Sequence, residues 1–251
     1  MLCFINNRDL LTWPKRMAEV LADQGHDVRL IDNASTYPPL LEWYDTCPFP
    51  VIRSQQNLGS QALWLLNVVP LHDPFVVSDS DLDISCIPID WPEALTEGLD
   101  AGACKCGFSL DDTKIPSANP AWTIDGFCNY PAGHHPATYG PKITFMGKRC
   151  LFHRYPVDTT FALYAAKIWV NGFRVGGIRA GHPYTARHLP WHLVLHPNPD
   201  EQSLQLPLTE ELYYYYTHVE QTASCGSTTA KRLKSMLDEY AGRGNHEIRG
   251  S

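Results

Sequence analysis

Three aspartates at alternate positions, Asp79, Asp81 and Asp83, are the part of the sequence best suited to chemistry. They follow an apolar run at residues 75–77, which has the composition of a short buried strand. Hard divalent cations prefer carboxylate oxygens together with substrate phosphates, and alternate residues of an extended chain share one face. The spacing therefore predicts a cation site at the carboxyl end of a strand, the edge where open α/β sheets bind ligands. The alternative is an ordinary polar loop after a buried strand, because Asp-x-Asp is a short and frequent pattern.

The composition is that of an ordinary globular chain. Of the 251 residues, 44% are hydrophobic and 19% are charged, which is enough for one large domain or two small ones. The formal net charge of −7 argues against nucleic acid as a partner, because binding to a phosphate backbone depends on clustered Lys and Arg. No run of about 18 apolar residues occurs, so we expect no membrane span and no export signal.

The cysteines give no indication of a metal site of their own. Eight of them stand at positions 3, 47, 86, 104, 106, 128, 150 and 225, and no two form a Cys-x-x-Cys pair. We therefore expect reduced, mostly buried thiols, which are typical of a cytoplasmic protein.

Strands and helices alternate over the first 83 residues. Apolar periodicity predicts strands at 2–6, 27–32, 50–54 and 75–77, separated by helices at 9–24, 40–45 and 60–67. This order predicts a parallel sheet with right-handed crossovers. The expected fold class is α/β, with a mostly parallel central sheet flanked by helices. We expect a single domain over residues 1–251, with a nucleotide-binding half at 1–85, an acceptor and catalytic half at 86–207, and a helical C-terminal tail at 208–251.

The second half of the sequence is less regular. We expect a helix at 91–99 with Asp90 as its cap, and strands at 101–110, 141–146 and 172–178. Residues 111–140 are rich in Pro, Gly, Asn, His and aromatic residues and lack a long periodicity, which is typical of a functional loop. The aromatic side chains of this loop suit stacking on a sugar, or they pin the loop to the core.

Two further segments carry candidate side chains. Asp158 stands before an expected helical run at 161–164, in the position of an N-cap. Arg187, His188 and His192 lie close together further on, but Pro190 interrupts the helical pair that two zinc-binding histidines would form. We therefore expect one histidine to join the aspartates, and the alternative is a lone surface histidine. The four tyrosines at 213–216 belong to an expected helix, where packing explains them as well as a binding role does.

Taken in order, these segments resemble the GT-A-fold nucleotide-sugar glycosyltransferases, particularly the inverting family-2-like group. Residues 4–8 are similar to that group's first strand and turn, and residues 31–35 to the turn that receives a pyrimidine base. Residues 57–59 resemble its Asn-x-Gly motif and residues 79–81 its Asp-x-Asp motif. Residues 157–160 are similar to the segment with the catalytic acid. Residues 187–191 look like the C-terminal segment that closes over the diphosphate and gives a histidine to the metal.

The resemblance implies a metal-dependent, inverting transfer of a sugar, a hexose or a deoxyhexose such as rhamnose. The donor would be a UDP- or dTDP-sugar and the acceptor a hydroxyl of a glycan or glycoconjugate. Nucleotide contacts are implied for Ile5, Asn6, Asn7, Arg8, Asp32, Asn57, Asp79 and Ser80. The implied cofactor is Mn²⁺ or Mg²⁺, held by Asp79, Asp81 and His188, with Asp83, Arg187 and His192 as further candidates for contact with the metal or the donor.

Chemical reasoning agrees with these roles. A divalent cation that bridges carboxylates and phosphates neutralises a departing diphosphate. Direct inversion also needs a carboxylate that accepts the proton of the acceptor hydroxyl. Asp158 is the expected base and Asp125, in the irregular loop, is the second choice; the alternative for Asp158 is a capping residue without a catalytic role.

Two other functions stay open at this point. A nucleotidyltransferase of sugar phosphates also has a nucleotide-binding sheet and metal-binding acids, although residues 6–9 lack the glycines of its usual phosphate loop. A non-catalytic domain that binds a nucleotide or a sugar would keep the fold without turnover. A donor-hydrolysis assay with and without manganese separates these three functions.

Overall fold

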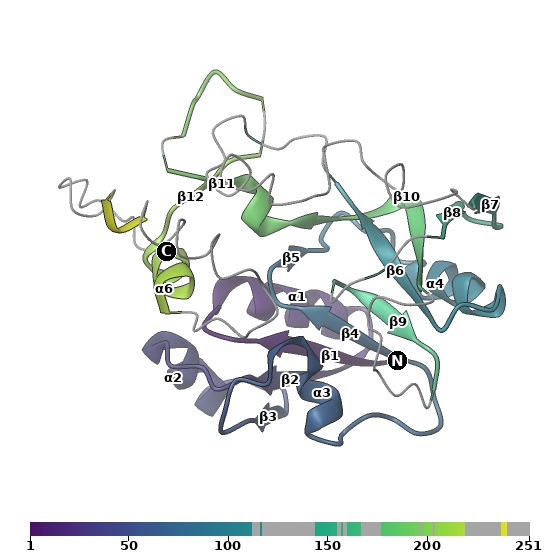
Figure 1. Ribbon diagram of the computed structural model, residues 1–251, viewed down its shortest axis with the longest axis horizontal. Helices are drawn as coiled ribbons and strands as arrows, with labels where there is room; N and C mark the ends of the chain where they lie inside the picture. The colour runs from purple at the N-terminus through teal and green to yellow at the C-terminus, as the bar shows by residue number, and fades with distance from the viewer. Residues whose placement is uncertain are drawn as a thin grey trace.

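The main feature of the protein is a ten-stranded mixed sheet (Figure 1). The computed structural model describes residues 1–111, 116, 144–154, 157, 160–166, 177–195, 197–202, 204–218 and 237–239. Along the sheet the strands follow the order β3-β2-β1-β4-β9-β6-β10-β8-β7, and β5 pairs with β10 beside this path. Their bounds are β1 Leu2–Asn7, β2 Asp27–Asp32, β3 Val51–Arg53, β4 Phe75–Asp79, β5 Leu82–Asp83, β6 Lys105–Leu110, β7 Thr144–Met146, β8 Leu151–His153, β9 Ala162–Tyr164 and β10 Gly177–His188.

Helices lie on both faces of this sheet, and the segments around β11 (Leu193–Val194) and β12 (Leu206–Pro207) form a second, two-stranded sheet. The α-helices are α1 Thr12–Asp23, α2 Pro38–Thr46, α3 Ala62–Leu65, α4 Trp91–Asp100 and α6 Glu210–His218, and the 3-10 helices are η1 Gly59–Gln61 and η2 Leu189–His192. Within the described ranges, no helix is long and apolar enough to cross a membrane.

The α/β fold class expected from the sequence is confirmed. β1, β2, β3 and β4 are all parallel, as their alternation with helices predicts. β9 then enters the sheet antiparallel to both β4 and β6, and the hairpin of β7 and β8 extends the far edge. The division of the chain into two halves and a tail stays a prediction.

Successive side chains of a strand pack against two different layers of helices, one on each face of the sheet. Cys3 and Ile5 of β1 belong to a core with residues of α1, α2 and α4, whereas Phe4 belongs to a second core with residues of α3. Successive side chains of a strand point to opposite faces, so both faces of the parallel part are covered. This explains why β1 is apolar over residues 2–5 and β4 over residues 75–77, before the polar residues at their carboxyl ends.

The extended aspartate run expected after β4 is wrong. β4 ends at Asp79, the chain bends at Ser80 and Asp81, and β5 starts at Leu82. The cause is long-range pairing, because β5 joins the end of β10 instead of continuing β4. The three aspartates therefore come from a strand end, a bend and a separate strand.

The helix expected after Asp158 is also wrong. Residues 162–164 form β9, which pairs with β4 and β6. A run this short has no periodicity that separates a helix from a strand. Asp158 lies outside the described residues, and no helix begins among residues 160–166 for it to cap.

Asp90 stands at the N-cap position of α4, as expected, but its side chain makes no capping hydrogen bond. Its carboxylate instead accepts from the Tyr184 hydroxyl at 3.0 Å and pairs with Arg149 at 3.3 Å.

The six cysteines that the structure describes are all free thiols. Burial raises the pKa of one of them, Cys150, to about 11.

Candidate functional site

The predicted nucleotide contacts meet at the carboxyl edge of the parallel strands. Asn6 of β1 is in register with Asp79 of β4, and Asn7 is in register with Asp32 of β2. Ile5 lies one residue deeper and is fully buried in the core. The side chains named from the sequence therefore come from three neighbouring strands and reach the edge where such sheets bind ligands.

Two asparagines fix the loop that precedes α3. The Gly59 carbonyl accepts from Nδ2 of Asn6 at 3.1 Å and from Nδ2 of Asn33 at 3.0 Å. Asn33 Oδ1 accepts from the Leu58 N–H, and Asn57 Oδ1 accepts from the Gly59 N–H. Gly59 has a φ of +64°, which glycine adopts without strain. Asn33 was missed in the sequence, where the only signal was a polar residue after Asp32.

The loop between β1 and α1 is held by its own polar residues. Asn7 is buried, and its Nδ2 donates to the Leu10 carbonyl at 2.7 Å and to the Tyr44 hydroxyl at 2.8 Å. Arg8 Nε lies 3.5 Å from a carboxylate oxygen of Asp9, which is fully buried. Arg8 thus stands at the carboxyl edge between a structural asparagine and a structural aspartate.

Asp32, the predicted reader of the base, is buried at the end of β2. Its Oδ1 accepts from the Ser35 N–H at 2.9 Å, and its backbone carbonyl accepts from the Ser54 N–H at 2.8 Å. A turn of this kind is a common use of aspartate. It fixes the carboxylate beside Asn7, at the mouth of the loop between β2 and α2.

Asp81 and His188 form the centre of the site. Asp81 Oδ2 lies 3.4 Å from His188 Nε2, and both side chains are 16% exposed. The Asp81 carbonyl accepts from the Leu189 N–H at 2.9 Å, and the His188 ring packs edge-on against Trp191. Burial, followed by the negative charge of Asp81, raises the pKa of Tyr216 in α6.

Both members of this pair have a polar atom left over. Asp81 Oδ1 and His188 Nδ1 are buried and form no hydrogen bond within the part of the chain that the structure describes. Buried polar atoms are normally satisfied, and an exception calls for a ligand, an ion or water. A carboxylate oxygen next to an imidazole nitrogen is a suitable start for a divalent metal site.

The described part of the chain supplies few ligands for such a metal. Among the described residues, no group of three or more His, Cys, Asp or Glu side chains could hold an ion. Mg²⁺ and similar ions are often held by one or two carboxylates, with substrate phosphates and water as the remaining ligands. The pair of Asp81 and His188 fits this mode of binding, in which the coordination of the metal is complete only when a phosphorylated substrate is bound.

Asp83 and Arg187 are already paired with each other. They are opposite one another in β5 and β10, with Arg187 Nη1 3.2 Å from Asp83 Oδ2, and Asp83 Oδ1 accepts from the Ser85 N–H. Burial alone would raise the pKa of Asp83, but hydrogen bonds from Ser85 and the charge of Arg187 outweigh it and hold the pKa below its usual value. Arg187 Nε also lies 3.9 Å from Asp111.

His192 has a different environment from His188. It is fully buried in η2, and its Nδ1 lies 3.2 Å from the Leu204 carbonyl. This contact ties η2 to the segment before β12, so His192 is placed to support the fold. Its role as a candidate contact of the metal or the donor stays a prediction, as do the roles of Asp83 and Arg187.

Some predicted residues are placed only in part. Asp79 ends β4 opposite Asn6, and Ser80 is buried in the bend that follows. Asp125 and Asp158 lie outside the described residues. Val157, directly before Asp158, is fully buried in the core that covers α3.

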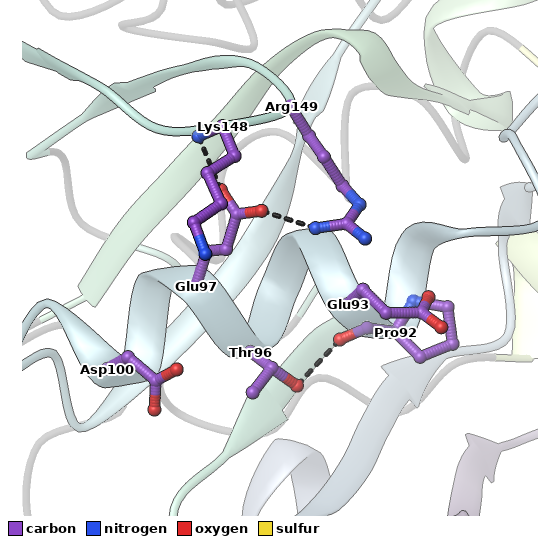
Figure 2. A pocket seen from close by; sticks show the side chains of 7 residues that line it. All are labelled: Pro92, Glu93, Thr96, Glu97, Asp100, Lys148 and Arg149. Atoms are coloured by element: carbon purple, nitrogen blue, oxygen red, sulfur yellow. Dashed lines mark hydrogen bonds and ion pairs between the residues drawn. The ribbon is translucent and has the colours of Figure 1, made fainter.

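A shallow pocket of about 330 Å³ lies elsewhere, on α4 and the turn between β7 and β8 (Figure 2). Across it, Arg149 NH1 pairs with Glu97 Oε1 at 2.5 Å, and the Lys148 N–H donates to Glu97 Oε2. None of the predicted site residues lines this pocket. Its lining residues are Pro92, Glu93, Thr96, Glu97, Asp100, Lys148 and Arg149.

Comparison with known proteins gives distant structural similarities only. No protein-family model and no curated protein sequence matches the chain. One similar structure is glucosyl-3-phosphoglycerate synthase from Mycobacterium tuberculosis with phosphoglyceric acid, at 12% identity and a TM-score of 0.35 over 50% of each chain. The same enzyme with Mn²⁺, UDP-glucose and phosphoglyceric acid matches at 11% identity and a TM-score of 0.38, over 65% of this chain and 55% of that one.

A third similar structure is S. aureus TarS 1–349, at 9% identity and a TM-score of 0.39, over 95% of this chain and 68% of that one. The chain spans about half the length of the two mycobacterial structures. Likeness at this level carries no activity from one protein to another, because one fold hosts many functions. The function of this chain therefore has to be argued from its own site.

Proposed function

We propose that this protein is a metal-dependent glycosyltransferase that moves a sugar from a UDP- or dTDP-sugar to a hydroxyl of a glycan or glycoconjugate. The sugar is a hexose or a deoxyhexose such as rhamnose, and the transfer proceeds with inversion. The observation that carries the proposal is the pair of Asp81 and His188, 3.4 Å apart at the carboxyl edge of the sheet. Each has a buried polar atom without a hydrogen bond among the described residues.

The neighbours of this pair favour a nucleotide diphosphate as the donor. Asp32, at the end of β2, supplies an acceptor for the N3–H of uracil or thymine. Asn6 and Asp79 lie between it and the bend that carries Asp81. One line of residues along the edge thus offers a base reader at one end and a metal-binding pair at the other.

Asp81 and His188 would hold the cation, with Asp79 as a direct or water-mediated contact. When bound, the cation supplies charge neutralisation for the departing diphosphate. An imidazole ligand favours Mn²⁺ over Mg²⁺, since Mg²⁺ has the stronger preference for oxygen. The unused Asp81 Oδ1 is the atom we assign to the metal.

Asp158 is the proposed general base. Its carboxylate would accept the proton of the acceptor hydroxyl while that oxygen bonds to the anomeric carbon and the bond from this carbon to the diphosphate oxygen breaks. Attack on the face opposite the leaving group inverts the configuration. A positioned base of this kind is typically worth about 100-fold to 10,000-fold in rate.

Calorimetry with UDP, in the presence and absence of MnCl₂, tests the proposal. We expect manganese to tighten UDP binding to the wild-type protein, and Asp81→Asn to remove this gain. Asp45→Asn is a matched control, since Asp45 is exposed and pairs only with the surface residue Arg53 among the described side chains. The metal assignment would be contradicted if the affinity for UDP did not depend on manganese, or if Asp81→Asn kept the manganese-dependent gain in affinity.

Turnover separates the proposal from its alternatives. A glycosyltransferase releases UDP from a nucleotide sugar in a manganese-dependent reaction. A nucleotidyltransferase instead releases pyrophosphate from UTP and a sugar phosphate, and a binding domain shows affinity without either product. Pyrophosphate release would refute the proposed function in favour of a nucleotidyltransferase. UDP binding without turnover across a panel of donors would refute it in favour of a binding domain.

A further inference from the structure

Glu211 of α6 caps α1, a helix near the opposite end of the chain. Its Oε1 accepts from the N–H groups of Leu11 at 2.6 Å and Thr12 at 2.9 Å, and its Oε2 accepts from the Thr12 hydroxyl at 2.5 Å. The Glu211 side chain is buried. Helix α1 begins here, and its N-cap residue Leu11 has a side chain that cannot accept a hydrogen bond. A distant carboxylate thus accepts from two N–H groups at the start of α1 and places a negative charge at the positive end of the helix dipole.

The same helix also contacts the loop between β2 and α2. The Tyr214 hydroxyl donates to Thr36 Oγ1 at 3.0 Å, and the rings of Tyr214 and Tyr37 lie 4.9 Å apart. In Figure 1, α6 lies on the same side of the picture as α2, away from α4, β7 and β8. α6 therefore joins the ends of two loops that leave neighbouring strands.

Those two loops are also tied directly to each other. Asp9, which has a φ of +57°, accepts through Oδ1 from the N–H groups of Thr36 at 2.5 Å and Tyr37 at 2.9 Å. The Asp9 N–H donates to Ser35 Oγ at 3.0 Å. Leu10, next to Asp9, packs in a small core with residues of α6 and β11. The contacts form a closed ring through α6, the β1–α1 loop and the β2–α2 loop.

This ring lies next to the residues of the proposed nucleotide site. Asn7 ends β1 directly before the β1–α1 loop, Arg8 belongs to that loop, and Asp32 immediately precedes the β2–α2 loop. A change of about 1 Å in the position of either loop would move these side chains relative to a bound nucleotide. Misplacement of this size commonly costs a large factor in binding or rate.

We infer that Glu211 is a positioning residue, which acts through the N-terminus of α1 to hold the β1–α1 loop in its nucleotide-binding conformation. The inference rests on the proposed function, because it assigns the affinity for the donor nucleotide partly to α6. Glu211 itself touches Leu11 and Thr12, and it is not assigned to the catalytic residues. The C-terminal segment thereby becomes a determinant of donor affinity.

The test compares Glu211→Gln with Glu210→Gln in the full chain. Glu210 is the adjacent exposed acid of α6, so the two variants lose the same charge on the same helix turn. We expect Glu211→Gln to weaken UDP binding in MnCl₂ about tenfold, a change of about 1.4 kcal/mol, and to keep the manganese dependence. In steady-state kinetics the donor KM should rise while kcat stays unchanged. Glu210→Gln should match the wild type in both measurements.

Hydrogen exchange without nucleotide supplies the second readout. The amides of residues 9–12 should exchange faster in Glu211→Gln than in the wild type or in Glu210→Gln, because the cap no longer holds them. A Glu211→Gln variant with wild-type UDP affinity and only a lower melting temperature would overturn the inference, since Glu211 would then serve stability alone.

Failure of the proposed function looks different. If the wild-type protein does not bind UDP with manganese, the proposed function is refuted and the inference falls with it, since no nucleotide-binding conformation is left for Glu211 to hold. If the wild type binds UDP with manganese and Glu211→Gln binds it equally well, the inference alone is overturned and the proposed function stands.

Discussion

His188 and His192 lie four residues apart, yet alanine substitution should affect two different properties. His188 lies 3.4 Å from Asp81 and has a buried Nδ1 without a hydrogen bond among the described residues. His192 is fully buried, and its Nδ1 contacts the Leu204 carbonyl at 3.2 Å. We therefore expect His188→Ala to weaken ligand binding and His192→Ala to weaken the fold.

The expected loss for His188→Ala follows from its place beside the proposed metal. Removing an outer-shell partner of a metal ligand commonly costs about 10-fold to 100-fold in metal affinity, or about 1.4 to 2.7 kcal/mol, and loss of a ligand should cost at least this much. The variant should therefore need that much more MnCl₂ to reach the wild-type affinity for UDP. Its free energy of unfolding should change less than that of His192→Ala, because the His188 side chain keeps some exposure to water.

For His192→Ala the cost lies in packing and in one hydrogen bond. Truncating a large buried side chain leaves a cavity, and the Leu204 carbonyl loses its contact with the ring, so we expect a loss of about 2 to 4 kcal/mol in the free energy of unfolding. The affinity of the folded protein for UDP with manganese should stay close to that of the wild type.

Calorimetry with UDP over a series of MnCl₂ concentrations measures the first effect, and urea unfolding measures the second. Both variants are measured at a temperature where circular dichroism shows each to be folded. If His192→Ala loses manganese-dependent affinity while His188→Ala keeps it, the choice of imidazole is wrong. Equal effects on affinity would show that neither ring is a specific ligand.

Three further outcomes test other parts of the site. Asp32→Asn keeps an acceptor for the Ser35 N–H but faces the base with an amide, so the free energy of UDP binding should weaken by about 1 to 3 kcal/mol. If the wild type binds GDP more tightly than UDP, the assignment of Asp32 to the base is refuted. The pKa of Asp83 is lowered in the folded protein, so its stabilising effect is present above its unfolded value near 3.9 and is lost as the pH falls through the folded value. Urea unfolding should show wild-type protein about 1 kcal/mol more stable than Asp83→Asn at pH 7, with the difference shrinking below about pH 4, and a difference that grows at low pH would contradict the Arg187 ion pair. Asp158→Asn should lose about 100-fold to 10,000-fold in turnover with nearly unchanged UDP affinity, and a product that retains the donor's anomeric configuration would exclude this role.

The sequence by itself determined which residues reach the carboxyl edge. Alternating strands and helices over the first 83 residues require a parallel sheet, and parallel strands end at one edge. Asn6, Asp32 and Asp79 each stand at the end of such a strand, so their meeting follows from local periodicity and strand order. The chemical identity of these side chains is the basis for proposing an anionic, metal-dependent ligand.

The tertiary structure alone decided how the second half completes the site. Pairing of β5 with β10 puts Arg187 on Asp83 and places His188 beside Asp81, although more than 100 residues separate them. Nothing local in the sequence separates His188 from His192, or marks residues 162–164 as a strand. The short run there fits both periods, and the neighbours β4 and β6 decide.

The cap of α1 is the clearest contact that the sequence did not predict. Glu211 and Thr12 are 199 residues apart, and the hydrogen bond between them depends on where α6 packs. Helix and strand periods arise from neighbours a few residues apart, so one sequence displays them directly. Contacts between distant segments depend on the packing of whole surfaces and on the pairing of buried charges, and those are fixed only when the chain is folded.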